Sequence, residues 1–329
     1  MFSIIKRGEK FFEKVMELEQ SEVIERIRKN IEKVIIGKSE VIDLMLTALI
    51  ASGHVLLEDV PGVGKTSLAK ALARSIDCDF KRVQFTPDLL PGDLTGINVF
   101  NQKIGDFEFK KGPIFTNILL ADEINRATPR TQSSLLECME ERQVTVDGVT
   151  YKLDRPFFVI ATQNPIESYG TFPLPEAQID RFLMKVKMGY PKREEEKRII
   201  EVFDKKNPLE ELKPVCTKED VLKMQEEYKE VYVDKDVSEY ILDIVEKTRN
   251  MEEIELGASP RATLFLYKTS QAYAYVKGRD FVTPDDVRYI APFVLAHRII
   301  LKGSGKLRDI KAEEVIGRIL EEVPVPLEK

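Results

Sequence analysis

The sequence predicts an α/β fold, in which a parallel sheet carries helices on both faces, followed by a smaller, all-helical domain. Up to residue 190, short apolar segments typical of buried strands alternate with helical segments. After Pro191 the pattern changes to charged segments with helical periodicity. We therefore expect two domains, at residues 1–190 and 191–329.

Composition narrows the class of protein. The chain has 329 residues, 43% of them hydrophobic and 32% charged, so it can bury a sizeable core. Its 50 Lys and Arg against 56 Asp and Glu give a net charge of −6, which disfavours a surface built to follow phosphate backbones. Three separated cysteines and two histidines make a disulfide framework, a His-rich zinc site or a His-dependent triad unexpected.

We expect a cytoplasmic protein without membrane insertion. The longest run without a charged side chain, residues 44–57, is shorter than the roughly 20 residues that cross a bilayer. Residues 1–14 lack the continuous apolar stretch of a secretory leader.

Elements of the first domain follow from apolar spacing. Spacings of three and four predict helices, and short apolar runs between turn residues predict buried strands. Helices are expected within residues 11–34, 41–50 and 67–76, and strands at 54–57, 81–85, 118–121 and 157–161.

Two hairpins are expected to project from this core. Asp147-Gly148 suits a two-residue type I′ turn, which would pair Val146 with Val149 and Val144 with Tyr151. Alternating aromatic and charged residues after a turn at Gly105-Asp106 predict a second hairpin within 97–110.

The second domain is expected to contain helices at 193–203, 218–229, 236–249, 260–275 and 284–290. Thr283, Pro284 and Asp286 supply the N-cap, first-position proline and first-turn acid of the last of these.

A phosphate-binding loop is predicted between the first strand and the following helix. Glycines let backbone N–H groups turn toward phosphate oxygens, the helix N-terminus adds its positive end, Lys65 reaches the β and γ phosphates, and Thr66 holds magnesium. Asp59 stands where the general pattern has glycine, so the pattern does not predict the conformation of the first turn of the loop. The alternative is a structural glycine-rich turn. The candidate nucleotide-binding residues here are Val60, Pro61, Gly62, Val63, Gly64, Lys65, Thr66 and Ser67.

Two acids end the apolar run that begins at Ile118. Asp122, at a strand end, can bind the magnesium shell, and Glu123 can orient or deprotonate the attacking water. Taken alone, acids after a strand more often begin a solvated loop; downstream of a phosphate loop the catalytic interpretation is favoured. No N-K-x-D segment for reading guanine occurs, so a GTPase is not expected.

At this point the chain resembles the AAA+ ATPases, and more closely the MoxR family within them. The resemblance implies an AAA+ P-loop core with a helical lid, which binds ATP with Mg²⁺. It also places the two hairpins among the insertions of the helix-2-insert branch. It rests on residues 56–66, 122–127, 163–165 (Gln-Asn-Pro), 174–182 and 259–262.

The resemblance also implies roles for single residues. Asn164 matches sensor 1, with a turn Asn before Pro165 as the alternative. Arg181 matches the arginine finger; the alternative is an ion pair with Asp180 or another local acid.

Two further positions depend on the resemblance. Arg261 matches the sensor 2 arginine, and in the first turn of its helix it opposes the helix dipole, a cost that contact with a phosphate would offset. Adenine is expected beside residues 34–37, which end at Gly37, although core packing explains these apolar residues equally well. The role of Arg126 is left open between catalysis and a structural ion pair.

The sequence therefore predicts an ATPase that assembles with itself into a ring, expected to be a hexamer, and remodels protein partners by closing and opening its lid. The resemblance implies clients with von Willebrand factor type A domains. Two alternatives stay open: a nucleic-acid motor, disfavoured by composition, and a nucleotide-gated scaffold that hydrolyses little, disfavoured by Glu123, Asn164 and Arg181 together.

Overall fold

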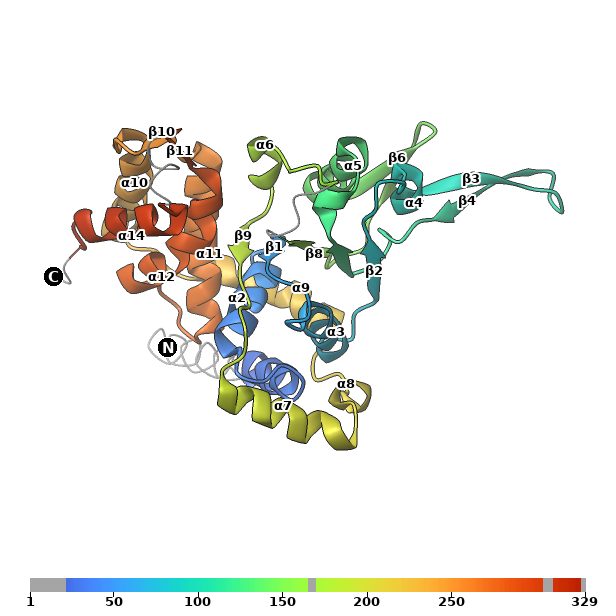
Figure 1. Ribbon diagram of the computed structural model, residues 1–329, viewed down its shortest axis with the longest axis horizontal. Helices are drawn as coiled ribbons and strands as arrows, with labels where there is room; N and C mark the ends of the chain where they lie inside the picture. Colours follow the sequence, from blue (N-terminus) through green and yellow to red (C-terminus); the bar gives the residue numbers. More distant parts are fainter. Residues whose placement is uncertain (1–21, 165–169, 304–309, 327–329) are drawn as a thin grey trace, which may run out of the picture.

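The computed structural model describes residues 22–164, 170–303 and 310–326, whose helices and strands are shown in Figure 1. The helix expected within residues 11–34 is described from residue 22 and extends to residue 32; its earlier part lies outside the described residues. Ile24, Ile27 and Ile31 are buried, as their spacing of three and four requires.

A five-stranded parallel sheet forms the centre of the first part of the chain. Its order is β2-β5-β8-β1-β9, so the strand before the glycine-rich loop lies between β8 and β9. The strands are β1 (Val55–Glu58), β2 (Phe80–Gln84), β5 (Ile118–Asp122), β8 (Phe158–Gln163) and β9 (Met184–Val186). Sequence analysis did not predict β9, because three residues with a lysine in the middle give too short an apolar run.

Helices cover both faces of this sheet. Val55 and Leu57 of β1 pack in the buried cluster that includes α2 (Ser39–Ile50) and α3 (Lys65–Ser75). Leu56 between them packs in a second cluster with α5 (Pro129–Glu141). Because successive side chains of a strand point to opposite faces, this alternation shows a sheet buried on both sides. The expected α/β core is confirmed.

Both expected hairpins are present, and Figure 1 shows that one of them extends far from the sheet. In the smaller hairpin, Val146 pairs with Val149 and Val144 with Tyr151, as predicted. Its strands are β6 (Gln143–Val146) and β7 (Val149–Lys152); the longer hairpin follows the short helix α4 (Pro91–Thr95) and consists of β3 (Gly96–Asn101) and β4 (Asp106–Lys111).

The two hairpins contact each other. The rings of Phe109 and Tyr151 stack with centroids 4.2 Å apart, and Phe115 packs against the edges of both. Asn98 Nδ2 donates to Asp147 Oδ2 at 2.7 Å. The hairpins therefore form one joined unit.

The C-terminal part is helical, as expected, with one addition. β10 (Ile254–Leu256) and β11 (Ile300–Leu301) pair antiparallel, so the backbone groups of two connecting segments satisfy each other. Thr283 is the N-cap of α12, as expected, and the first-turn Asp286 also accepts from the backbone N–H of Thr283, so the cap is reciprocal. The helices are α7 (Arg193–Lys205), α8 (Pro208–Glu211), α9 (Lys218–Glu227), α10 (Lys235–Asn250), α11 (Pro260–Val276), α12 (Pro284–Leu295) and α14 (Ala312–Glu322).

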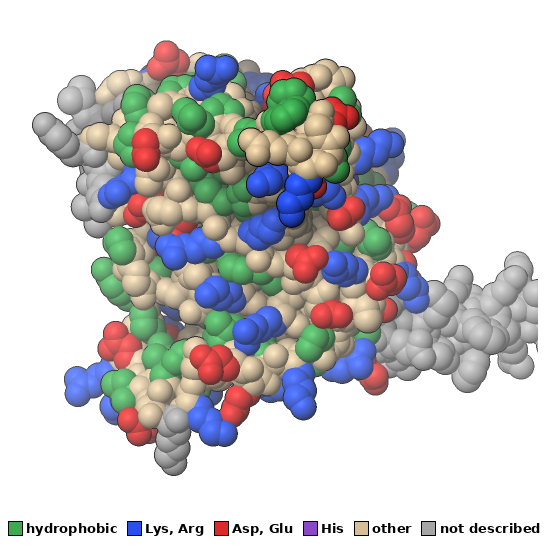
Figure 2. Space-filling model, turned by 90° about the vertical axis from the view of Figure 1, so that its right-hand side faces the viewer, with side chains coloured by type: hydrophobic (Ala, Val, Ile, Leu, Met, Phe, Trp, Pro, Cys, Tyr) green, Lys and Arg blue, Asp and Glu red, His purple; other side chains and the backbone are tan. Residues whose placement is uncertain are grey.

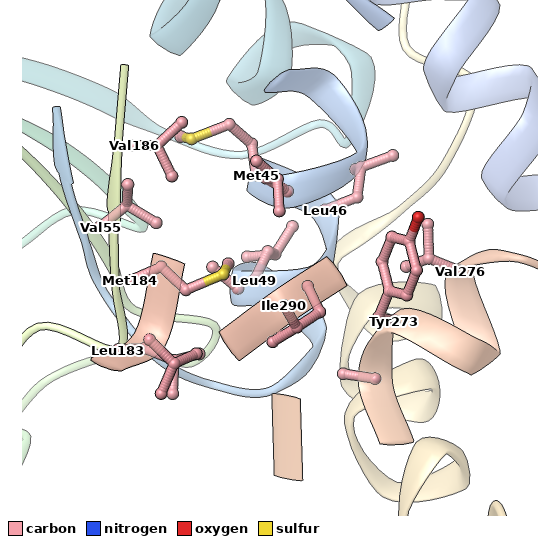
Figure 3. Close-up of a cluster of buried hydrophobic side chains, with 14 of the residues drawn as sticks. Met45, Leu46, Leu49, Val55, Leu183, Met184, Val186, Tyr273, Val276 and Ile290 are labelled. Carbon is pink, nitrogen blue, oxygen red and sulfur yellow. The ribbon is translucent and has the colours of Figure 1, made fainter. Parts of the chain in front are cut away.

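Helices α11 and α12 share a hydrophobic core with α2 and β9, which Figure 3 shows in close-up. The contact joins the helical part to the sheet part, although the division expected at residue 190 stays a prediction. Its labelled members are Met45, Leu46, Leu49, Val55, Leu183, Met184, Val186, Tyr273, Val276 and Ile290. Within the described ranges, none of the helices combines the length and apolarity needed to cross a membrane.

Candidate active site

The glycine-rich loop, residues 59–66, joins β1 to α3 at the carboxyl edge of the parallel sheet. Gly62 and Gly64 have φ values of +86° and +95°, which favour glycine. Gly64 is the N-cap of α3, so the first N–H groups of this helix have no partner within it and face the loop. Such a loop can bind phosphate oxygens. The turn carries all the predicted loop residues: Val60, Pro61, Gly62, Val63, Gly64, Lys65, Thr66 and Ser67.

Lys65 begins α3 and folds back over the loop. Its Nζ donates to the carbonyl oxygens of Asp59, at 2.7 Å, and Val60, at 3.2 Å. Burial lowers the pKa of Lys65, while the charges of Asp59, Asp122 and Glu123 oppose this shift. The ammonium group is thus held beside the loop among carboxylates, where a polyphosphate would take over its contacts.

Asp122 ends β5, and a neighbouring strand fixes its orientation. Thr162 of β8 donates its hydroxyl to Asp122 Oδ1 at 2.6 Å and accepts from the backbone N–H of Glu123 at 2.8 Å. Arg82 of β2 donates to Asp122 Oδ2 at 2.6 Å. Parallel strands thus bring Asp122 to the same sheet edge as the loop.

Glu123 follows with φ +57°, a left-handed conformation that is uncommon for glutamate and marks a constrained position. Its Oε2 accepts from Gln84 Nε2 at 2.6 Å and pairs with Arg126 Nε at 3.1 Å. Arg126 therefore contacts the carboxylate that we expect to act on water. Its ion pair with Glu123 is compatible with both a structural and a catalytic role.

Asn164 directly follows β8 and is buried, with 6% of its surface exposed. β8 lies between β5 and β1, so Asn164 leaves the sheet between the strands that carry Asp122 and the loop. Pro165, the next residue of the predicted motif, lies outside the described residues.

Thr66 and Asp122 are suitable ligands for Mg²⁺. A hydroxyl and a carboxylate are hard oxygen donors, and magnesium usually takes few protein ligands because phosphates and waters complete its octahedron. The described residues contain no group of three or more His, Cys, Asp or Glu that could hold a metal alone. This donor set fits a nucleotide-bound magnesium ion.

Residues 34–37 are the segment beside which adenine is expected. Val34, Ile35 and Ile36 are buried, so they serve the core, as the alternative interpretation holds. Gly37 has φ +74°, and a Cβ there would collide with the side chain of Glu195 on α7. This segment and α7 are therefore in contact.

Arg181 and Arg261 lie at the opposite edge of the sheet. Arg181 precedes β9, whose first residue pairs with Val55, the first residue of β1. The phosphate loop follows the last residue of β1, so one strand length, about 10 Å at about 3.3 Å per residue, separates the two edges.

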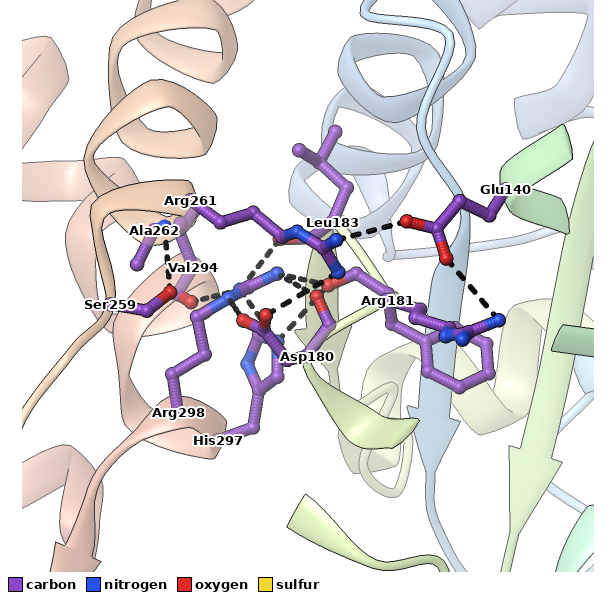
Figure 4. Close-up of polar contacts among 11 residues, drawn as sticks. Glu140, Asp180, Arg181, Leu183, Ser259, Arg261, Ala262, Val294, His297 and Arg298 are labelled. Atoms are coloured by element: carbon purple, nitrogen blue, oxygen red, sulfur yellow. Dashed lines mark hydrogen bonds and ion pairs between the residues drawn. The ribbon is translucent and has the colours of Figure 1, made fainter. Parts of the chain in front are cut away.

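Figure 4 shows that Glu140, at the end of α5, pairs with both arginines. Arg181 Nη1 lies 3.3 Å from Glu140 Oε2, and Arg261 Nη2 donates to Glu140 Oε1 at 2.9 Å. Arg261 also lies 3.6 Å from Asp180. Carboxylates of the same subunit thus offset the unfavourable position of Arg261 at the start of α11.

Comparisons with known proteins agree with this arrangement. Residues 54–184 match the model of the ATPase family associated with various cellular activities, and residues 246–319 match that of the AAA lid domain. Chaperone MoxR1 of Mycobacterium tuberculosis is 41% identical over 92% of this chain and 82% of its own length.

The chain belongs to the MoxR family of AAA+ ATPases. An uncharacterized protein of Bacillus subtilis, YeaC, is 53% identical over 92% of this chain and 94% of its own length. The crystal structure of a candidate ATPase from Cytophaga hutchinsonii superposes with a TM-score of 0.91 at 40% identity, covering 97% of this chain and 99% of that one.

Sequence analysis of this MoxR-family chain missed the residues that pack against the predicted site residues or bind their neighbours. Arg298 is the clearest case: it is buried, donates to Asp180 Oδ1 at 2.8 Å and lies over the ring of Phe265. Burial lowers the pKa of Arg298 to about 10, so it stays charged at neutral pH. A signal was present, because a charge inside the apolar run 290–301 requires a buried partner.

Proposed function

We propose that this MoxR-family protein binds ATP with Mg²⁺ and hydrolyses the bond to the γ-phosphate. The observation that supports this most is the grouping of Lys65, Asp122, Glu123 and Asn164 at one edge of the sheet, beside a glycine-rich loop that leads into the N-terminus of α3. These parts supply charge neutralisation, a metal ligand, a base and a water-orienting amide, the set that phosphoryl transfer to water requires.

Each residue has one task in this proposal. Lys65 binds the β and γ phosphates, and Thr66 and Asp122 would hold Mg²⁺, which would supply charge neutralisation at the phosphate oxygens. Glu123 accepts the proton of the attacking water, and Asn164 orients that water. The products are ADP and phosphate. Gln84 and Arg126 keep the carboxylate of Glu123 in position.

Arg181 and Arg261 would act on the nucleotide of a neighbouring subunit. Arg181 lies just before the start of β9, and Arg261 shares its ion-pair partner Glu140, whereas their own loop follows the last residue of β1 at the other edge of the sheet. In a ring, this edge of one subunit can face the loop of the next. We therefore propose a ring, expected to be a hexamer, in which each site is completed by the arginines of its neighbour.

The work done by hydrolysis is proposed to be chaperone-like. One relative is named a chaperone, and others are named MoxR, which supports remodelling or maturation of protein partners. The joined hairpins expose apolar side chains, including Phe100 at 51% and Phe107 at 66% of their surface, as a client-binding element would. Clients with von Willebrand factor type A domains stay a proposal from the family resemblance.

Two alternatives receive no support from a specific observation. Figure 2 shows acidic and basic side chains interspersed on the face from which the long hairpin projects, rather than a basic groove for nucleic acid. A scaffold that hydrolyses little would not need Glu123 constrained at φ +57° beside Asp122. The nucleic-acid motor and the scaffold therefore remain only as outcomes of the ATPase experiments.

Two variants test the ATPase. Lys65→Ala should lose ATP binding in calorimetry, because the loop keeps its N–H groups but loses the cation that offsets the triphosphate charge. Glu123→Gln keeps the shape of the side chain and leaves Asp122 intact, so it should bind ATP like the wild type. Its turnover should fall by about 10² or more, because the base is gone.

Other outcomes would reject parts of the proposal. Unchanged ATP affinity of Lys65→Ala would show that this loop is not the site. Wild-type turnover of Glu123→Gln would remove Glu123 from the mechanism. A wild-type protein that binds but does not hydrolyse ATP would favour the scaffold, and a large rate increase with single-stranded DNA would favour the motor.

A further inference from the structure

Asp59 occupies the first position of the phosphate loop, where the general pattern has glycine. It is buried, with 9% of its surface exposed, and its carboxylate accepts three backbone N–H groups. Oδ1 accepts from Val60 at 3.0 Å, and Oδ2 accepts from Met188 and Gly189, both at 2.6 Å. The last two donors lie about 130 residues further along the chain.

These donors belong to the segment between β9 and α7, which we call the linker, residues 187–192. The linker rests on the phosphate loop at further points. A Cβ on Gly64 would lie 3.9 Å from Met188 Cε, and Met188 is buried. Lys38 Nζ donates to the carbonyl of Tyr190 at 3.0 Å. The linker therefore bridges the loop and the segment that follows Gly37.

The linker also sets the position of α7. This helix begins at Arg193, directly after the linker, and Glu195 in its first turn lies against Gly37. Glu195 Oε2 accepts from the backbone N–H of Lys192 at 2.7 Å, so the end of the linker is fixed to the helix. A continuous set of contacts thus runs from Asp59 through the linker to Gly37, where we expect the adenine.

We propose that Asp59 is a positioning residue that binds the linker to the phosphate loop. It thereby fixes the position of the adenine side of the site relative to the phosphate side. The proposal rests on the proposed binding of ATP. Charge-assisted hydrogen bonds to a buried carboxylate are among the stronger ones in proteins. Glycine at this position would allow the loop to form but leave the N–H groups of Met188 and Gly189 without their acceptor.

The test is Asp59→Gly in the full chain, with two probes. ATP should bind at least about tenfold more weakly, because the two hydrogen bonds from Met188 and Gly189 to a charged group no longer order the site. Inorganic tripolyphosphate with Mg²⁺ has no base, so it would use the phosphate side of the site but not the adenine side, and its dissociation constant should change by less than about twofold. Without any nucleotide, amide exchange of Met188 and Gly189 should accelerate at least about tenfold.

Two further variants serve as controls. Asp59→Asn keeps one acceptor oxygen for the linker but presents an NH₂ group to the N–H of Val60, so its ATP affinity should lie between those of wild type and Asp59→Gly. Asp77→Gly makes the same chemical change at an exposed turn residue with φ +49°, and should leave ATP affinity and linker exchange unchanged.

Equal weakening of ATP and tripolyphosphate by Asp59→Gly would show that Asp59 supports only the loop and would overturn the proposal. Unchanged amide exchange at Met188 and Gly189 would overturn it as well. Failure of the wild type to bind ATP would instead refute the proposed function, and the exchange measurement would still decide whether Asp59 holds the linker.

Discussion

At the scale of the residue, His54 shows how burial turns a titratable group into a structural one. It lies just before β1, and its Nδ1 accepts from the backbone N–H of Val159 at 3.0 Å. Its Nε2 therefore carries the proton and donates to the carbonyl of Met139 at 3.1 Å. Burial lowers the pKa of His54 to about 4. The neutral ring thus joins the start of β1 to β8 and α5.

This pKa predicts a dependence of stability on pH. In the unfolded chain His54 takes up a proton near pH 6.5, whereas in the folded chain it stays neutral until about pH 4. Its contribution to the free energy of unfolding is complete above pH 6.5 and falls by about 1.4 kcal/mol per pH unit below that, about 3 kcal/mol by pH 4. Urea unfolding of wild type and His54→Gln between pH 7.5 and 4.5 measures it.

The stability gap between the two proteins should shrink as the pH falls. His297 is half-buried and its pKa is also lowered by desolvation, but it is present in both proteins and its effect cancels. Gln keeps a donor for Met139 and does not titrate, so the variant should start lower and decline less. Parallel stability curves would show that the pKa of His54 is ordinary.

Candidate site residues could be proposed from sequence where the signal is local. The loop from Gly62 to Thr66 and the pair Asp122-Glu123 are contiguous, so their chemistry is readable without a fold. The partners of Asp59 could not be predicted, because Met188 and Gly189 contribute only backbone N–H groups. Backbone donors leave no trace in residue type, and only the parallel pairing of β1 with β9 brings them within reach.

At the scale of the element, periodicity and turn chemistry predicted the long or self-contained units. The Asp147-Gly148 turn fixed the register of the smaller hairpin because a two-residue loop allows only one pairing. β9, β10 and β11 have three, three and two residues, too few for a period to register. These short strands form because the tertiary fold brings the backbone of a partner strand within hydrogen-bonding distance.

The ring stack between the hairpins carries a prediction at this scale. Tyr151→Ala removes the stack on Phe109, which we expect to be worth about 0.5–1.5 kcal/mol beyond its buried area. Amide exchange in β3 and β4 should accelerate, while exchange in β1 and β8 should not change. Hydrogen exchange followed by mass spectrometry resolves these segments.

Val149→Ala is the matched control for this variant. Val149 lies on the same strand, is 52% exposed and takes no part in the ring stack. Its truncation should therefore leave amide exchange in β3 and β4 as in the wild type. Similar exchange in both variants would mean that the hairpins are joined by other contacts, such as that between Asn98 and Asp147.

At the scale of the whole molecule, the two edges of the sheet carry different halves of the proposed site. One edge carries the phosphate loop, Asp122 and Glu123, and the other carries Arg181 and Arg261. Arg298 anchors the second edge to the helical part through Asp180. α11 and α12 also share a core with α2 and β9, so a displacement of the helical part would shift these arginines relative to a neighbouring loop.

This division of the site predicts catalysis in trans. An arginine that completes a neighbour's site stabilises transition-state charge, an effect worth about 10³ to 10⁵ in rate for finger arginines. Arg181→Ala should therefore bind ATP normally and hydrolyse it at least about 10³ more slowly. Turnover per subunit of the wild type should rise with protein concentration as subunits assemble, which a coupled phosphate-release assay can follow.

Mixing separates this role from the alternative, in which Arg181 only holds the core together through its ion pair with Glu140. Lys65→Ala subunits retain Arg181, so they should restore hydrolysis to Arg181→Ala subunits when the two co-assemble. Glu140→Ala removes the ion pair but leaves the arginine, and should keep most of the wild-type turnover if Arg181 acts on a neighbour. A mixture that co-assembles but stays inactive, or a Glu140→Ala variant as inactive as Arg181→Ala, would assign Arg181 to its own subunit.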